Sequence, residues 1–202
     1  IKVELSRDRI KEAQKVIEKY KFDPEDPNKS SLKIKKELME TSGYINLKKE
    51  NNELKGDLLV KSCKLKPIRT PSNFYPKTTD EYLILFVMAA LIKGISVFKN
   101  ISGLSNKESS RAFEMKKILG QIGIKCKLSK NEMKIFGKGM IDASDKRIFV
   151  PNLGDHRICQ STFILAALTG AKAKIDNFET VFTSAPSFLK IIKSLGAKFE
   201  KI

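Results

Sequence analysis

The only histidine of this 202-residue chain lies in the charged segment Gly154-Asp155-His156-Arg157, which directly precedes a long apolar run. The pattern predicts a helix whose first turn carries a carboxylate, an imidazole and a guanidinium. A helix N-terminus presents unpaired N–H groups and a partial positive charge, so an arginine there creates a site for phosphate or carboxylate. A structural interpretation is that Asp155 caps the helix and Arg157 is solvated. Taken by itself, the segment favours this second interpretation.

A second charged segment, Ser105-Asn106-Lys107-Glu108-Ser109-Ser110-Arg111, also suggests a helix start. Ser105 and Glu108 have the spacing of a capping box, which is the structural interpretation. That interpretation leaves Lys107 and Arg111 unexplained. Four residues apart, they would share one helix face, where like charges repel and the positive end of the helix disfavours them. A bound anion would remove both objections.

A third segment, Pro76-Lys77-Thr78-Thr79-Asp80-Glu81, opens an apolar run that predicts a helix as far as Ile92. Asp80 is either the N-cap of that helix or a general base at its tip. If the three predicted helices run parallel, their charged starts converge. The assembled site then has cations for anionic groups, and carboxylates and an imidazole for proton transfer. Such a set suits the transfer of a group between two phosphorylated or carboxylated small molecules.

An internal repeat is expected to position these helix starts. Residues 89–94 lead into an alternating strand over 95–99, and residues 166–170 lead into a similar strand over 171–176. A second helix and a glycine-containing exit follow each strand, and a further exit of this kind occurs at 38–47. The unit of helix, strand, helix and then strand or hairpin recurs roughly every 75 to 80 residues, so copies must share a core.

The apolar pattern divides the predicted helices into two classes. Residues 82–92 and 158–168 are apolar nearly all round, which is typical of buried helices, whereas 107–119 and 186–195 are two-faced and should lie outside. The sequence therefore predicts an α/β fold with buried helices and surrounding sheets.

Composition narrows the functional classes. The net charge of +16 comes mostly from lysines scattered along the chain, and tryptophan is absent, so no stacking platform for nucleic acid is indicated. The longest apolar stretch, 83–92, is too short to cross a bilayer. Three widely spaced cysteines without a CxxC pair favour reduced thiols in a cytoplasm over disulfides or a zinc site.

Several segments carry a family resemblance. Leu65–Glu81 ends in an acidic pair, Lys107–Arg111 has the sequence Lys-Glu-Ser-Ser-Arg, and Asp155–Arg157 has the sequence Asp-His-Arg. In this order and at this spacing they resemble motifs of the enolpyruvyl transferase family, most closely those of its 5-enolpyruvylshikimate-3-phosphate synthases. Ser184–Gly196 is similar to the closing helix of that family. The resemblance covers residues 32–202.

The resemblance implies a protein of two lobes, each built from three βαβαββ units with parallel buried helices, which close on the substrates between them. This chain resembles the C-terminal lobe over residues 32–202, whereas residues 1–31 are a predicted N-terminal helix and linker of unclear role. The implied reaction transfers the enolpyruvyl group of phosphoenolpyruvate to the 5-hydroxyl of shikimate 3-phosphate and releases phosphate. No metal or organic cofactor is implied, and neither nucleic acid nor a membrane is an expected partner.

The resemblance also implies residue roles. Asp80 would take the proton of the shikimate 5-hydroxyl, Glu108 would exchange protons at the enolpyruvyl methylene carbon, and Lys107 would assist at both substrates. The remaining side chains of the motifs would hold phosphoenolpyruvate: Arg111, His156 and Arg157.

The chain departs from the family in ways that leave alternatives open. Many members have arginine in place of Ser105 and aspartate in place of Ser110, and some have a phosphoenolpyruvate-binding lysine near Thr183. The Lys-Ser phosphate motif and substrate arginine of the other lobe do not occur in this sequence. We therefore expect a fragment that lacks the N-terminal lobe and is inactive alone. The alternatives are a non-catalytic remnant lobe that binds a small anion or a partner protein, and a sibling transferase that acts on a sugar nucleotide.

Overall fold

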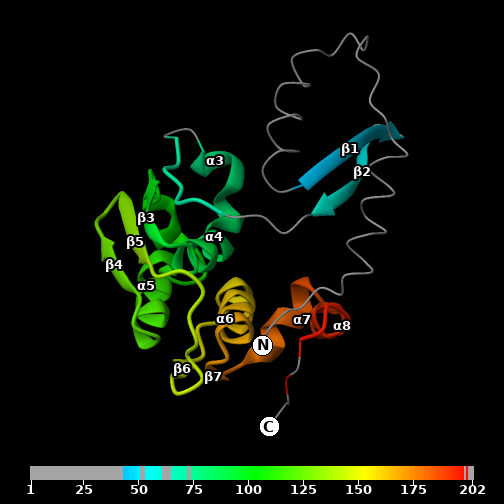
Figure 1. Ribbon diagram of the computed structural model, residues 1–202. Coiled ribbons are helices and arrows are strands. Elements are labelled where there is room, and N and C mark those ends of the chain that lie inside the picture. The colour runs from blue at the N-terminus through cyan, green and yellow to red at the C-terminus, as the bar shows by residue number, and fades with distance from the viewer. Residues whose placement is uncertain (1–42, 51–52, 61–64, 72–73, 198, 200–202) are drawn as a thin grey trace. The chain divides into compact units, whose positions relative to one another are not determined.

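The computed structural model describes residues 43–50, 53–60, 65–71, 74–197 and 199 (Figure 1). The chain divides into two compact units, with a boundary between Leu65 and Lys66. The predicted division at residue 31 lies outside the described residues.

The described part of the smaller unit is an antiparallel hairpin of strands β1 (Gly43–Glu50) and β2 (Glu53–Val60). The strands pair in register from Gly43 opposite Val60 to Glu50 opposite Glu53. The helix exit predicted at 38–47 lies partly outside the described residues, and its glycine, Gly43, begins β1.

The larger unit mixes helices and strands along the chain. Its first half contains α3 (Tyr75–Thr78), the 3₁₀ turn η1 (Thr79–Glu81), α4 (Tyr82–Ala90), β3 (Gly94–Lys99), the 3₁₀ turn η2 (Ser102–Asn106), α5 (Arg111–Gln121), β4 (Lys125–Leu128) and β5 (Glu132–Gly137). Its second half contains β6 (Arg147–Val150), α6 (His156–Thr169), β7 (Lys172–Ile175), the 3₁₀ turn η3 (Phe178–Thr180), α7 (Val181–Ser184) and α8 (Phe188–Ser194). The predicted α/β class is confirmed. The finer βαβαββ unit stays a prediction.

The described residues of the larger unit form two sheets. The first has the antiparallel order β3-β5-β4, and the second is the parallel pair β6-β7. A parallel bridge joins Arg69 to Val97 of β3. Around it, the Val97 N–H donates to the Ile68 carbonyl at 2.8 Å and the Thr70 N–H donates to the Val97 carbonyl at 2.9 Å. The sheet edge therefore anchors the chain segment that leads to α3 and Asp80.

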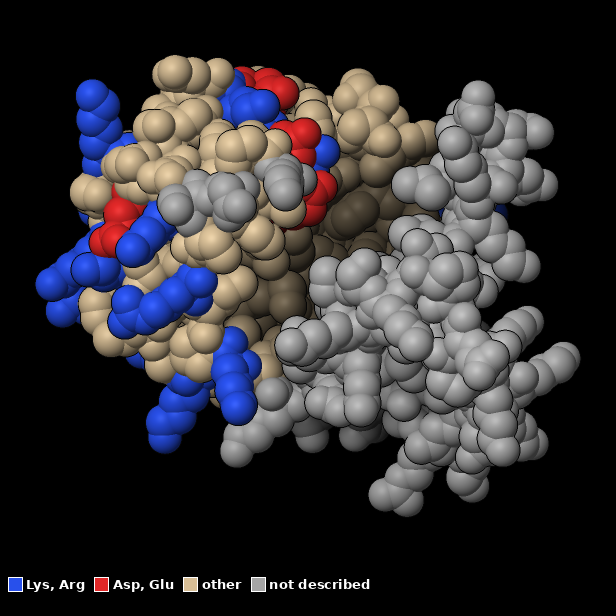
Figure 2. All heavy atoms as spheres, turned by 90° about the horizontal axis from the view of Figure 1, so that it is seen from above, with Lys and Arg blue, Asp and Glu red and all other residues tan. Residues whose placement is uncertain are grey.

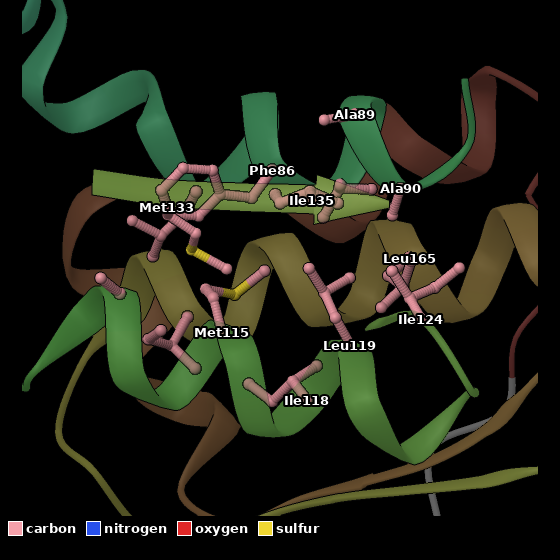
Figure 3. Packing of buried hydrophobic residues seen from close by; sticks show 14 of the residues in the cluster. Phe86, Ala89, Ala90, Met115, Ile118, Leu119, Ile124, Met133, Ile135 and Leu165 are labelled. Atoms are coloured by element: carbon pink, nitrogen blue, oxygen red, sulfur yellow. The ribbon is translucent and has the colours of Figure 1, made fainter. Parts of the chain in front are cut away.

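The hydrophobic core lies where α4, α5 and α6 contact one another and the first sheet. Figure 3 shows side chains of α4, α5, α6 and β5 that point toward one another, among them Phe86, Leu119, Leu165 and Met133. These four side chains are fully buried, and large apolar side chains of this kind each contribute about 1.5–3 kcal/mol when they leave water. This packing determines where the N-terminal ends of α5 and α6 lie.

The predicted division of helices into buried and two-faced classes is largely confirmed. Six of the nine residues of α4 are buried, although Met88 is exposed. In α5, Met115 and Leu119 are buried while Lys116 and Lys117 are exposed, as expected of a two-faced helix. Helix α8 begins two residues after the predicted start at 186, and none of its residues is fully buried.

Basic side chains are spread over the face of the molecule that Figure 2 shows. In the view of Figure 2, many lysine and arginine side chains project separately from the surface, and acidic side chains lie beside basic ones at its upper edge. This agrees with the scattered lysines of the sequence. Among the described residues, no helix has the length and apolar content needed to cross a membrane.

Candidate functional site

The N-terminus of α6 has the predicted cap. Asp155 is the N-cap residue, and its Oδ1 accepts the backbone N–H of Arg157 at 3.0 Å and that of Ile158 at 3.3 Å. Half-buried His156 is the first residue of the helix. The other half of the structural interpretation is wrong, because Arg157 is not simply solvated. Its Nη1 donates to the backbone carbonyl of Asp80 at 2.8 Å, so α6 contacts the turn before α4.

The second segment does not form the predicted helix start. Turn η2 ends at Asn106, the backbone at Lys107 is extended, and α5 begins only at Arg111. The capping box of Ser105 and Glu108 is therefore wrong, as is the shared helix face of Lys107 and Arg111. The extended backbone lets the Glu108 carboxylate fold back onto Arg111, with Oε2 at 2.6 Å from Nη2. A charge-assisted bond to a buried guanidinium outweighs a solvent-exposed cap, which contributes about 1 kcal/mol.

Arg111 joins the three charged segments. Its side chain is 1% exposed, and its nitrogens donate to three carboxylates. Nε lies 2.9 Å from Oδ2 of Asp155, Nη1 lies 3.1 Å from Oδ1 of Asp80, and Nη2 bonds Glu108. Burial alone would lower the pKa of Arg111, but the hydrogen bond that Arg111 donates to Asp155 and the negative charges of Asp155 and Glu108 outweigh burial and raise this pKa. The guanidinium is therefore a permanent buried cation that is paired with carboxylates of the protein itself.

Asp80 does not cap α4. It lies in η1, and the N-cap position of α4 is occupied by Glu81 without a side-chain cap bond. The Asp80 carboxylate instead faces cations from both other segments. Besides Arg111, Oδ1 lies 3.9 Å from Nζ of Lys107, and Oδ2 lies 3.5 Å from Nη2 of Arg157. The structural interpretation of Asp80 is wrong, and its carboxylate lies at the centre of a charged cluster.

Ser109 contacts the buried carboxylate of Asp155, a role that its position in the sequence does not predict. Its hydroxyl donates to Oδ2 of Asp155 at 2.8 Å, beside the bond from Arg111. Burial would raise the pKa of Asp155, but the hydrogen bonds from Arg111 and Ser109 outweigh it and lower the pKa below its usual value. Asp155 is therefore a buried carboxylate as well as a cap. No local signal in the sequence distinguishes this double role from an ordinary N-cap.

The convergence of the three segments, which the sequence predicted only for parallel helices, is found in the structure. We define the charged cluster as Lys107, Arg111 and Arg157 together with Asp80, Glu108 and Asp155. Its cations and carboxylates balance in number. The side chains that a ligand can reach are one third to one half exposed: Lys107 at 35%, Asp80 at 45%, Glu108 at 48% and Arg157 at 33%. Chemically, such a surface can bind an anion beside groups that accept and donate protons.

Comparison with known proteins gives a consistent result over the same segments. Residues 28–192 match the model of a family described as EPSP synthase (3-phosphoshikimate 1-carboxyvinyltransferase). A Paramagnetospirillum magneticum protein named 3-phosphoshikimate 1-carboxyvinyltransferase is 32% identical over 142 residues, which cover 70% of this chain and 31% of the relative. A protein of the same name from Zymomonas mobilis is 31% identical over 159 residues, covering 78% and 35%. Another from Bradyrhizobium diazoefficiens is 29% identical over 157 residues, covering 74% and 33%. The matched region thus spans about a third of the length of these curated relatives.

Proposed function

The chain belongs to the EPSP synthase family, and from that membership we propose that it is the C-terminal lobe of a cytoplasmic 3-phosphoshikimate 1-carboxyvinyltransferase of the shikimate pathway, which makes precursors of aromatic amino acids. The lobe extends over residues 32–202 and is built from βαβαββ units, and residues 1–31 precede it. Its partners are shikimate 3-phosphate, phosphoenolpyruvate and an N-terminal lobe. The observation that carries the proposal is the convergence of Asp80, Lys107–Arg111 and Arg157 in one cluster.

In this proposal, the reaction joins the 5-hydroxyl oxygen of shikimate 3-phosphate to C2 of phosphoenolpyruvate. The carbon–oxygen bond to phosphate breaks, and the proton of the hydroxyl leaves, in net terms, with the phosphate. Asp80 accepts the hydroxyl proton, and Glu108 delivers a proton to the methylene carbon and later removes one. Both carboxylates are about half exposed, so substrates can reach them.

Phosphoenolpyruvate is held in this proposal by the cations of the cluster and by His156. Lys107 and Arg157 are one third exposed and can contact its phosphate and carboxylate. Arg111 is buried under Asp80 and Glu108, so it acts on an incoming anion through its charge unless those carboxylates move. Because catalysis requires a cleft closed from both sides, the chain alone is inactive.

A single histidine makes a direct test possible. Phosphoenolpyruvate is titrated into the whole chain at millimolar concentration while the His156 imidazole is followed by NMR. A saturable shift that is absent in Arg157→Gln supports the proposal. An unchanged imidazole supports the second candidate, a remnant lobe, which is favoured by one observation: the charged cluster is balanced without any ligand. Turnover of both substrates by the chain alone would contradict the two-lobe part of the proposal.

A further inference from the structure

We propose that in the ligand-free chain the Asp80 carboxylate occupies the position of the anionic substrate, and that the substrate binds by displacing this carboxylate from Lys107 and Arg157. The inference rests on the proposed function of the site. In this inference, the Asp80 carboxylate and the anionic substrate compete for the same two cations.

The solvent exposure of each side chain limits which cations of the cluster can exchange a protein carboxylate for a ligand. Asp155 is 0% exposed and Arg111 is 1% exposed, so no ligand reaches either of them without a rearrangement of the core. The cations that an anion can reach are Lys107 and Arg157, and both already face Asp80. An incoming phosphate or carboxylate therefore meets positions that a protein carboxylate already holds.

The contacts of Asp80 differ in strength in a way that permits this exchange. Its bond to Nη1 of Arg111 is 3.1 Å long, within the usual hydrogen-bond range. The distances to Arg157 Nη2 and Lys107 Nζ are 3.5 and 3.9 Å, which are ion pairs without short hydrogen bonds. Displacing the carboxylate from these two cations therefore breaks no strong bond, while Arg111 retains it.

Arg157 stays in place when the carboxylate leaves it. Its Nη1 donates to the backbone carbonyl of Asp80 at 2.8 Å, and this bond does not depend on the Asp80 side chain. The guanidinium therefore keeps one nitrogen anchored and offers the other to an anion. Lys107, on a flexible stem, can follow the same ligand.

The exchange also couples the two substrates. In the ligand-free chain, Oδ2 of Asp80 faces Arg157. Once an anion takes over that cation, Oδ2 is free to accept a hydrogen bond from the hydroxyl of the second substrate. A carboxylate that competes for the cations and repels the incoming anion weakens binding, so its neutralisation should strengthen binding while it removes the proton acceptor.

A matched pair of variants tests this inference. Asp80→Asn removes the competing charge and keeps the backbone carbonyl, whereas Glu81→Gln makes the same change of net charge at the neighbouring exposed residue. Calorimetric titration of each whole chain with phosphoenolpyruvate and with inorganic phosphate, at one ionic strength, gives the dissociation constants. We expect about tenfold tighter binding by Asp80→Asn, and a change of less than about twofold by Glu81→Gln.

The outcomes separate the two proposals. Binding by Asp80→Asn that is equal to or weaker than that of the unmodified chain overturns the exchange, and the proposed function survives it. Equal tightening in both variants also overturns it, because the effect is then one of net charge alone. If neither the unmodified chain nor Asp80→Asn binds either anion, both proposals fail. Asp80→Ser, checked by circular dichroism, replaces the asparagine variant if that one does not fold.

Discussion

Replacing Asp155 with alanine should markedly lower the free energy of unfolding of this protein. The substitution removes the partner of the Arg111 Nε and the acceptor for the Ser109 hydroxyl. It also removes the cap on the N–H groups of Arg157 and Ile158. A buried cation and a helix terminus lose their partners at the same time.

The magnitude follows from these contacts. Removing one partner of a buried ion pair costs about 3 to 5 kcal/mol. The lower end applies here, because Asp80 and Glu108 still pair with Arg111. Loss of the cap adds about 1 kcal/mol. We expect a decrease of about 4 kcal/mol in the free energy of unfolding for Asp155→Ala, and about 3 kcal/mol for Asp155→Asn, whose amide oxygen can still cap the helix.

Urea unfolding of the whole chain, followed by circular dichroism, measures this loss. The control is Asp142→Ala, because exposed Asp142 also accepts a backbone N–H, from Ser144 at 2.9 Å, but contacts no buried cation. Asp142→Ala should leave the urea concentration at the unfolding midpoint almost unchanged. A double-mutant cycle with Arg111→Met should give a coupling energy of about 2 kcal/mol. A loss below about 1 kcal/mol for Asp155→Ala would refute the reasoning, since a cap alone contributes that much.

The dependence of stability on acid pH should also report on the pair of Arg111 and Asp155. The pKa of Asp155 is lowered in the folded chain because the hydrogen bonds from Arg111 and Ser109 outweigh burial. A lowered folded-state pKa contributes stability that is complete above the unfolded value, about 3.9, and is lost as the pH falls through the folded value. The free energy of unfolding should therefore fall below about pH 4, and more steeply in the unmodified chain than in Asp155→Asn. Equal slopes would show that the pair is not the cause.

Three further predictions concern the fold. Gly137→Ala should lower the free energy of unfolding by about 2 kcal/mol, because a Cβ at this position would clash with the backbone carbonyls of Ala89 and Ile92. Gly120→Ala is the control in the same urea assay. It has open space around it in α5 and should raise the free energy of unfolding by about 0.5–1 kcal/mol. Phe98→Ala, in the core, should lower the stability by about 3–5 kcal/mol, whereas Phe113→Ala, at an exposed position, should change it by less than about 0.5 kcal/mol. Equal losses of the two variants in thermal unfolding would contradict the assignment of Phe98 to the core. Burial raises the pKa of Cys159 to about 11, so iodoacetamide at pH 8 should modify it only after unfolding, as mass spectrometry of the peptide would show.

Elements with a strong local signal could be predicted from the sequence. The apolar run of α6 follows a capping aspartate, and its end coincides with Gly170, which adopts the left-handed conformation at φ 71°. These are interactions within a few residues, so the sequence contains them directly. The α/β class and the buried character of α4 followed in the same way from periodicity and composition.

The start of α5 could not be predicted in this way. Locally, Ser105 and Glu108 form a good capping box, yet the helix begins at Arg111. The hydrogen bonds that set the start of the helix are donated by Arg111 to two distant carboxylates. Asp155 is 44 residues away in the sequence, and Asp80 is 31 residues away. Local propensity contributes tenths of a kcal/mol to about 1 kcal/mol at such a position, and a buried cation with several carboxylate partners outweighs it.

By itself, the sequence determined the family, the α/β class, the cap on α6 and the set of charged residues that meet in one place. Only the tertiary structure decided what each charge does there. It buried Arg111 and Asp155 as a pair, left the side chains of Lys107 and Arg157 one third exposed, and set the Asp80 carboxylate against all three cations. The physical reason is that residue type and spacing specify which groups approach one another, whereas desolvation and hydrogen-bond partners depend on segments that only folding brings together.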